Sequence, residues 1–378
     1  MRIFFVCKQF ALRRDFIVDR YWRLWHLPAV LARRGHKVHG LACAYYPNLA
    51  GPMASMPYDG GELRWDVHHL SPYQMWRWPR YLARLRELAL GFAPDAIFAS
   101  SDAWQLGAAA WLSRSLKVPL IADFYDNYES FGASSIPGAR RMLRWAARNA
   151  RMTTFVSDPL RRMLIQRYGL SHPAHTLENA VEPHFFSHNS VATARMRLGL
   201  PIEARLIGTA GALDGSRGEQ ALYDAFVRLA EINSDLYLVL AGDPRPAPPP
   251  HPRIIKLGTL GHEQMPLFWK ALNVAVICLK DDAFGRFCFP QKLAEVAAVG
   301  TPVVFPRIGI FAEPGAATLG ECAETPDADG YAAAIQQQLA VPRASAWRPD
   351  DWPSLAAKLE GFLNRALLEG AGLMRNEI

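Results

Sequence analysis

The sequence predicts two α/β domains, each built on a doubly wound parallel sheet with helices on both faces. Three observations support this prediction. The chain has 378 residues, which is more than a domain with a single hydrophobic core usually contains. Its composition, 50% hydrophobic and 20% charged residues, is that of a globular protein. Short apolar strands alternate with helical segments in both halves of the chain, as they do in sheets buried on both faces.

The first half begins with the buried strand IFFVC (3–7). The segment from Tyr21 to Arg34 is apolar at helical spacing, and Gly35 is expected to end this helix. Four further strands follow, namely KVHGLAC (37–43), PDAIFAS (94–100), VPLIADF (118–124) and MTTFVS (152–157). These elements predict an N-terminal Rossmann-like domain over residues 1–185.

The second half repeats the alternation after residues 171–200, which we expect to connect the domains. Its strands are RLIGTAG (205–211), LYLVLAG (236–242), RIIKLG (253–258), VAVICL (274–279) and TPVVFP (301–306). They predict a C-terminal Rossmann-like domain over residues 186–355. Helical periodicity runs from Trp352 to Leu373. We expect the last segment of the chain, residues 356–378, to be a C-terminal helix that packs back toward the N-terminal domain. Because ligands of such sheets bind at the carboxyl ends of the strands, we expect the site in a cleft between the two domains.

Cysteine use and hydropathy indicate the compartment. The five cysteines lack metal-ligand spacing, which favours small apolar core residues in a reducing cytoplasm. No apolar run reaches the roughly 18 to 20 residues of a membrane span. The N-terminus MRIFFVCKQF is typical of a first strand and not of a signal peptide. We therefore expect a cytoplasmic protein.

The positive charge is unevenly distributed. The formal net charge is +7, with an isoelectric point near 9.2. Arginine recurs with tryptophan and tyrosine in four segments of the first half, at residues 19–27, 73–90, 140–152 and 160–169. Two interpretations stay open: contact with an anionic membrane surface or lipid phosphate, or amphipathic helices with solvated arginines and core tryptophans. A nucleic-acid partner is not expected, because no RNP, helix-turn-helix or zinc-finger pattern is present.

A glycine-rich turn, GALDGSRG (211–218), lies between a predicted strand and a predicted helix. Glycines allow backbone amides to approach a phosphate, and Arg217 offers bidentate pairing. The turn has neither the GxGxxG fingerprint nor the P-loop Lys-Ser/Thr pair. An ordinary glycine-rich turn therefore remains the alternative.

The apolar segment FCFPQKLAEVAAVGTPVVF (287–305) carries one lysine, Lys292, and one carboxylate, Glu295. Pro290 suits the first helical turn, where the backbone amides near Gln291 to Leu293 have no helical partner. Alone, Lys292 is explained as a surface residue and Glu295 as a partner of the helix dipole. Together they favour a nucleotide diphosphate, with the lysine at the phosphates and the glutamate at two ribose hydroxyls.

The arrangement P-x-K-L-x-E-x-x-A-x-G-x-P-V-V over residues 290–304 resembles the nucleotide-sugar motif of retaining family 4 glycosyltransferases of the GT-B fold. The resemblance covers nearly the whole chain, and further matching segments are LARRGHKVHGLA (31–42), PDAIFAS, VPLIADFYD, ENAVEPHFF (178–186) and RLIGTAGALDGSRGEQALYDAF. It implies transfer of a sugar from a UDP- or GDP-sugar to a lipid-linked or polysaccharide acceptor, in the synthesis of cell-surface glycans such as lipopolysaccharide. Location at the inner face of the cytoplasmic membrane is part of this expectation.

The resemblance also implies roles for individual residues. Gly211 and Arg217 match the glycine and lysine that bind the donor diphosphate, and Glu295 matches the glutamate that holds the ribose. Further donor contacts are implied for Gly258, Thr259, Pro290, Lys292 and Leu293. The implied catalytic residues are Arg217, Lys292, Tyr125 and Asp126, the last two standing where the family frequently has a His-Asp pair. The donor phosphate is expected to accept the acceptor proton, so neither a protein nucleophile nor a metal or other cofactor is expected.

Three positions depart from the family pattern, and Tyr125 in place of the histidine is the first of them. Ala212 replaces an arginine of the phosphate loop, and Phe287 replaces the glutamate that usually contacts the donor sugar. Asp281 and Asp282 lie nearby, although a turn after a strand explains them equally well. The departures leave two alternatives: a non-catalytic nucleotide-sugar-binding or scaffold protein, and a nucleotide-sugar epimerase on the same fold.

Overall fold

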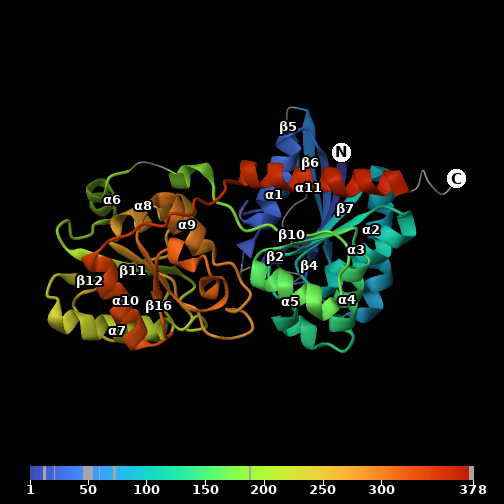
Figure 1. The fold of residues 1–378 in the computed structure, drawn as a ribbon. Coiled ribbons are helices and arrows are strands. Elements are labelled where there is room, and N and C mark those ends of the chain that lie inside the picture. The colour runs from blue at the N-terminus through green and yellow to red at the C-terminus, as the bar shows by residue number, and fades with distance from the viewer. Residues whose placement is uncertain are drawn as a thin grey trace. The chain divides into compact units, whose positions relative to one another are not determined.

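The structure is a computed structural model that describes residues 1–11, 14–20, 22–45, 54–58, 60–70, 74–186 and 189–373. The chain divides into two α/β units (Figure 1). Unit 1 comprises Met1–Glu178 and Trp352–Ile378, and unit 2 comprises Asn179–Asp351. The predicted boundaries, after residues 185 and 355, lie a few residues further along the chain than these. Unit 1 is thus completed by the C-terminal helix.

Unit 1 contains an eight-stranded sheet in the order β10-β9-β8-β7-β1-β4-β6-β5. All neighbouring strands are parallel except β5 and β6, which pair antiparallel at one edge. The strands are β1 Arg2–Lys8, β4 Lys37–Ala44, β5 Ala54–Tyr58, β6 Gly61–His69, β7 Ala96–Ser100, β8 Leu120–Phe124, β9 Met152–Phe155 and β10 Ala174–Thr176. A small separate hairpin joins β2 Phe10–Ala11 and β3 Arg14–Asp15.

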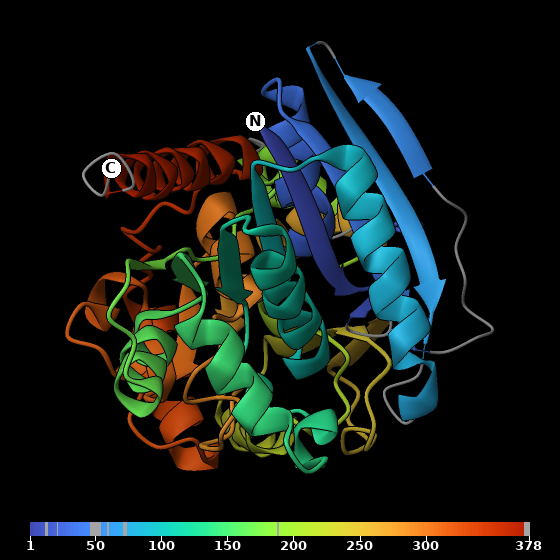
Figure 2. The same cartoon turned by 90° about the vertical axis from the view of Figure 1, so that its right-hand side faces the viewer.

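Helices cover both faces of this sheet. The strand order proceeds in opposite directions on the two sides of β1, and because crossovers are right-handed, the connecting helices lie on opposite faces. On one face α2, α3 and α4 lie side by side (Figure 2), and α11 packs on α1 on the other face. The helices are α1 Arg23–Arg33, α2 Trp78–Phe92, α3 Ala103–Leu116, α4 Ala139–Arg148, α5 Asp158–Tyr168 and α11 Trp352–Leu373. The helix predicted over residues 352–373 is therefore α11.

Unit 2 contains a six-stranded, wholly parallel sheet in the order β13-β12-β11-β14-β15-β16. The strands are β11 Arg205–Gly211, β12 Leu236–Gly242, β13 Ile254–Gly258, β14 Val274–Val276, β15 Val303–Pro306 and β16 Glu321–Ala323. The helices are α6 Val191–Leu198, α7 Glu219–Ile232, α8 Met265–Ala271, α9 Gln291–Val299 and α10 Ala328–Ala340. On one face of the sheet α7 and α10 pack together, and α6, α8 and α9 pack on the other (Figure 1).

The structure also contains elements that the sequence patterns did not predict. The hairpin β5–β6 lies in a stretch for which no strand was assigned. The segment 171–200, predicted to be a connector, contains the edge strand β10 and the helix α6. Tertiary pairing with β9 and packing on α8 explain these two elements, because neither has a strong periodic pattern of its own. All five cysteines are free, and four are buried, as expected for small core residues.

Candidate functional site

Three glycines mark the carboxyl edge of the unit 2 sheet. Gly211, Gly242 and Gly258 end the adjacent strands β11, β12 and β13, with φ angles of +125°, +136° and +69°. A Cβ atom on Gly242 would lie 2.1 Å from the carbonyl oxygen of Gly211. Only glycine fits so close a backbone approach. The carboxyl ends of parallel strands are where ligands of such sheets bind.

Lys292 lies against this edge from the first turn of α9. A Cβ atom on Gly211 would be 3.2 Å from both Cε and Nζ of Lys292. Within the described part of the chain, no hydrogen bond or ion pair involves the Lys292 ammonium group. Burial lowers the pKa of Lys292, and the nearby Arg217 lowers it further, whereas Cys278 and Glu219 raise it. An anion at the end of β11 would relieve both unfavourable effects.

Arg217 approaches the same place from the turn between β11 and α7. Its guanidinium carbon lies 3.5 Å from the centre of the Phe284 ring, a cation–π contact that holds the side chain in position. The Arg217 backbone N–H donates to Oε2 of the buried Glu219 at 3.2 Å. Arg217 and Lys292 thus lie close enough to repel each other, which suits a ligand that carries two negative charges.

Two helices begin at this edge without a side-chain cap. The N-cap residues are Gly218 for α7 and Pro290 for α9, and neither end has a side-chain capping bond. The Leu293 N–H donates to the Pro290 carbonyl at 2.9 Å. This amide is therefore used within the turn, contrary to the expectation that it is free. The remaining first-turn amides of α9 are those of Gln291 and Lys292, and such amides favour anions.

Glu295 lies one turn further along α9 and is 6% exposed. Its Oε2 accepts a 2.9 Å hydrogen bond from Nε1–H of Trp269 on α8. Burial raises the pKa of Glu295. Its other oxygen, Oε1, accepts no bond from any described residue and is not sealed from solvent. Sequence reasoning missed Trp269, because a tryptophan in the apolar segment PLFWKAL is typical of a core residue.

The segment after Glu178 is tied to α9. Nε2 of Gln291 donates to the Ala180 carbonyl at 2.8 Å. Glu182 and His262 pair at 2.8 Å between side-chain Oε1 and Nε2, and this pair acts electrostatically on Glu295. The segment ENAVEPHFF thus borders the predicted ribose position within unit 2.

The other predicted residues of unit 2 lie further from Lys292. Gly258 and Thr259 are exposed at the end of the edge strand β13, and β12 separates them from β11. Asp281 pairs with Arg286, and Oδ1 of Asp282 accepts the backbone N–H groups of Phe284 and Gly285 at 2.9 and 2.8 Å. These two carboxylates stabilise their own turn, as the simpler explanation predicted.

In unit 1, Tyr125 and Asp126 directly follow β8. Tyr125 is 4% exposed, and its ring packs against Trp22 and Tyr128 at centroid distances of 4.6 and 5.1 Å. The hydroxyl is buried without a hydrogen-bond partner among the described residues, and burial raises the pKa of Tyr125. Aromatic packing thus holds this hydroxyl away from solvent, so the expected contact with a substrate is not supported. Asp126 is partly exposed.

Sequence reasoning missed a polar cluster at the carboxyl edge of the unit 1 sheet. Lys8 ends β1 and Asp102 follows β7, at the place where the strand order reverses. The Tyr45 hydroxyl donates to Oδ2 of Asp102 at 2.7 Å. Burial lowers the pKa of Lys8, whereas Asp102 and Asp126 raise it. A switch point of this kind is a common ligand position, and the strand order is the signal that could have located it.

No group of three or more His, Cys, Asp or Glu side chains in the described ranges is arranged to hold a metal ion. Among the helices described, none is long and apolar enough to cross a membrane.

Two Rossmann-like α/β units in one chain are the architecture of the GT-B class. Two family models match the chain: Glycosyltransferase Family 4 over residues 23–185 and Glycosyl transferases group 1 over residues 204–340. The chain belongs to the family 4 glycosyltransferases with the GT-B fold.

Named relatives agree with this assignment. The chain is 30% identical over 148 residues to the D-inositol 3-phosphate glycosyltransferase of Stackebrandtia nassauensis, covering 34% of this chain and 32% of that protein. It is 25% identical over 238 residues to the GDP-mannose-dependent alpha-mannosyltransferase of Corynebacterium glutamicum, covering 61% of this chain and 54% of that protein. The matches thus span about a third and about half of these relatives. The fold is similar to Anabaena HepE in complex with UDP and glucose, with a TM-score of 0.70, 17% identity and coverage of 96% and 99%.

Proposed function

We propose that the protein is a retaining glycosyltransferase that moves a sugar from a UDP- or GDP-sugar to a lipid-linked or polysaccharide acceptor in cell-surface glycan synthesis. The observation that carries the proposal is the group of Lys292, Arg217 and Gly211 at the end of β11, with Glu295 one turn along α9. Two cations without acidic ion-pair partners in the described structure, beside an exposed glycine, suit a diphosphate.

The proposed chemistry follows from this arrangement. When the bond from the anomeric carbon to the diphosphate breaks, negative charge grows on the phosphate oxygen atoms. Lys292, Arg217 and the first-turn amides of α7 and α9 stabilise that charge without moving. Oε1 of Glu295 accepts hydrogen bonds from the ribose hydroxyls, and Trp269 keeps the carboxylate in place. In this scheme the donor phosphate takes the acceptor proton, and no protein nucleophile, metal or other cofactor takes part.

The acceptor is proposed to bind at the carboxyl edge of the unit 1 sheet, near Lys8, Asp102 and Asp126. Lys8 is partly desolvated, and the partly exposed carboxylate of Asp126 suits the hydroxyl groups of a sugar. Asp102 accepts hydrogen bonds from the first turn of α3 and from Tyr45, so its part is to hold negative charge beside Lys8. Activity at the inner face of the cytoplasmic membrane belongs to the same proposal.

The test is a calorimetric panel of UDP-, GDP- and ADP-sugars with native protein and the Lys292→Met and Glu295→Gln variants. Binding of one donor, weakened by both substitutions, is expected. A donor at 100-fold its Kd should add about 2.7 kcal/mol of stability in a thermal-shift assay. NMR of the transferred sugar then tests retention, and assays with and without a chelator test metal independence. Absence of binding by every donor would contradict the proposal.

A non-catalytic nucleotide-sugar-binding protein is the second candidate. Phe287 and Ala212 favour it, because both replace polar family residues at the donor site. Donor binding without transfer to any extracted lipid or glycan acceptor would support this candidate. Formation of an epimerised sugar from the donor alone would instead indicate an epimerase.

A further inference from the structure

The helices α2, α3 and α4 form one continuous face of unit 1, which we name the basic face. In Figure 2 the three helices lie side by side in front of the sheet, coloured from cyan to green. Their sequences contain eight arginines, one glutamate and no other charged residue. This excess of seven positive charges equals the formal net charge of the whole chain, +7. The remainder of the chain is therefore neutral by formal count.

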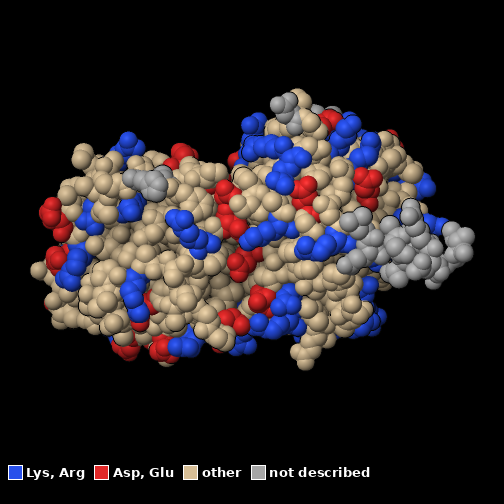
Figure 3. Space-filling view, turned by 45° about the horizontal axis from the view of Figure 1, so that its top comes forward, with Lys and Arg blue, Asp and Glu red and all other residues tan. Residues whose placement is uncertain are grey.

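The charges of the basic face are not compensated within the protein. Arg84 pairs with Asp66 and Glu87, and it is the one arginine of the eight with an acidic partner in the described ranges. The other seven are exposed; they are Arg80, Arg86, Arg114, Arg140, Arg141, Arg144 and Arg148. Figure 3 brings the top of Figure 1 forward, and there acidic and basic side chains are interspersed. Seven exposed arginines without an acidic partner in the described structure are thus gathered on the three helices of this face.

Exposed tryptophans occur on the same face. The structure describes three exposed tryptophans: Trp76 (75%) directly before α2, Trp111 (37%) on α3 and Trp145 (38%) on α4. Leu90 on α2 is 51% exposed. Exposed tryptophan beside arginine is typical of surfaces that enter the headgroup layer of a membrane.

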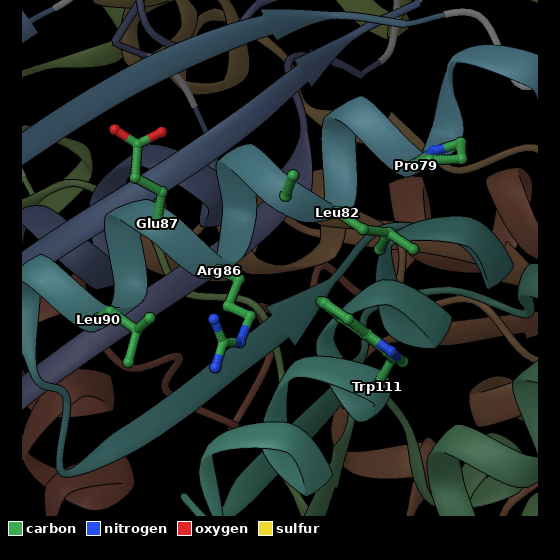
Figure 4. A pocket seen from close by; sticks show the side chains of 7 residues that line it. Pro79, Leu82, Arg86, Glu87, Leu90 and Trp111 are labelled. Carbon is green, nitrogen blue, oxygen red and sulfur yellow. The ribbon is translucent and has the colours of Figure 1, made fainter.

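A groove separates α2 from α3 on this face, with a volume of about 660 Å³. Its walls are mostly apolar and come from Pro79, Leu82, Ala83 and Leu90 of α2 and Trp111 of α3. Figure 4 shows Leu82, Arg86 and Leu90 pointing toward the α3 side, whereas Glu87 extends away from it. The groove thus has mostly apolar walls, with the cation of Arg86 and the carboxylate of Glu87 at its margin.

We infer that the basic face docks on a membrane containing anionic phospholipids, with Trp76, Leu90 and Trp111 in the interfacial layer and the arginines at the lipid phosphates. Charge complementarity selects this occupant. A second copy of the chain would bring two faces of like charge together. A nucleic acid would match the charge and could stack on the tryptophans, but the exposed Leu90 and the aliphatic side chains of the groove suit acyl chains and not bases. An acyl and glycerol layer suits these walls, while the arginine stems extend toward the phosphates.

The inference rests on the proposed function in one respect: a lipid-linked acceptor would place the enzyme at a membrane. Its test needs neither donor nor acceptor. Flotation of the purified full-length chain with phosphatidylcholine vesicles, with and without phosphatidylglycerol, measures binding directly. We expect binding to the anionic vesicles alone, with loss at high salt.

Two variant pairs locate the contact. Arg80→Glu with Arg141→Glu is expected to lower the vesicle partition coefficient at least about tenfold, since each basic residue near an anionic surface contributes about fivefold. The matched control, Arg197→Glu with Arg348→Glu, changes the net charge by the same amount. Both arginines are exposed in unit 2 and have no partner among the described residues, so this control should lower the partition coefficient much less. Trp76→Ala with Leu90→Ala should weaken binding several-fold. Its control, Met196→Ala with Ile232→Ala, removes side chains that are 72% and 70% exposed in unit 2.

Other occupants give different results. An equal loss of vesicle binding in the test variant and its control would show that net charge alone governs binding. That result would overturn the assignment of the contact to this face. Retention of an oligonucleotide in place of vesicles would favour nucleic acid, and concentration-dependent dimers broken by Trp76→Ala with Leu90→Ala would favour a second copy. Donor affinity should be the same in all four variants, so failure of docking and failure of the proposed function are separable.

Discussion

The two units differ in how a cation removed from water is paired: Arg23 of unit 1 is buried, and Lys292 of unit 2 is partly buried. In unit 1, Arg23 is 1% exposed and makes two bonds to Asp123, at 2.7 Å from Nη2 and 3.0 Å from Nε. In unit 2, Lys292 lies against Gly211 with no ion pair in the described structure. Satisfied buried charges hold a fold in one arrangement, whereas an unsatisfied one costs stability unless a ligand supplies the missing partner. The difference indicates a structural role for Arg23, and it supports the ligand-binding role proposed for Lys292.

Breaking the unit 1 pair should have the largest effect. Arg23→Met leaves Asp123 buried without its cation, although Ser100 and Thr154 still donate to it at 3.0 and 2.7 Å. We expect the free energy of unfolding to fall by about 3–5 kcal/mol, measured by chemical denaturation. The double variant Arg23→Met with Asp123→Leu should recover part of this loss. A single variant as stable as the native protein would contradict the structural role.

Removing the unit 2 cation should act on binding instead. Lys292→Met is expected to weaken nucleotide-sugar binding by about 100-fold, because one charge-assisted contact to phosphate contributes about 1.5–3 kcal/mol. Stability should be unchanged or higher, since the variant removes a desolvated charge. Because burial lowers the pKa of Lys292, donor affinity should decline on the alkaline side sooner than for an ordinary lysine. The control is Lys37→Met, an exposed lysine of unit 1.

The glycine edge offers a sharper comparison within unit 2. Gly242→Ala places a Cβ atom 2.1 Å from the Gly211 carbonyl oxygen, at a φ of +136°. Gly199→Ala has a positive φ of +66° but open space around the new atom. In the control, the free energy of unfolding should fall only by the cost of placing alanine at a positive φ, about 1–2 kcal/mol. We expect Gly242→Ala to lose about 1–3 kcal/mol more, together with donor affinity. Equal losses would show that the close approach is unimportant.

The smallest effect concerns Glu295. Burial raises its pKa, so between the unfolded value of about 4.3 and the raised value the folded chain holds a proton that the unfolded chain has released. Stability contributed by this group therefore falls as pH rises through that interval. Denaturation of Glu295→Gln and native protein across this range should show the variant gaining relative stability with pH. Glu231→Gln, at an exposed position of α7, should show no such trend.

The donor half of the protein was the easier half to predict. Glycines at strand ends and Pro290 before α9 fix backbone geometry, so the sequence alone indicated that Gly211 and Lys292 could share one site, and the structure places them side by side. Trp269, which orients Glu295, gave no signal because its role depends on packing between α8 and α9.

Unit 1 was less predictable for the same physical reason. The polar cluster of unit 1 consists of Lys8, Tyr45 and Asp102, which belong to three separate segments of the chain. The strand order brings these segments together. Tyr125 was assigned to the site by resemblance, but packing against Trp22 buries its hydroxyl. The hairpin β5–β6 was missed although Leu63, Trp65 and Val67 of β6 alternate with Arg64 and Asp66, which is the pattern of a strand.

The basic face changes the meaning of the isoelectric point. A value near 9.2 describes one surface of unit 1 and not the molecule as a whole, since the remaining residues cancel by formal count. On a cation-exchange resin the protein would adsorb mainly through α2, α3 and α4. The salt needed for elution would then fall more for Arg80→Glu with Arg141→Glu than for Arg197→Glu with Arg348→Glu.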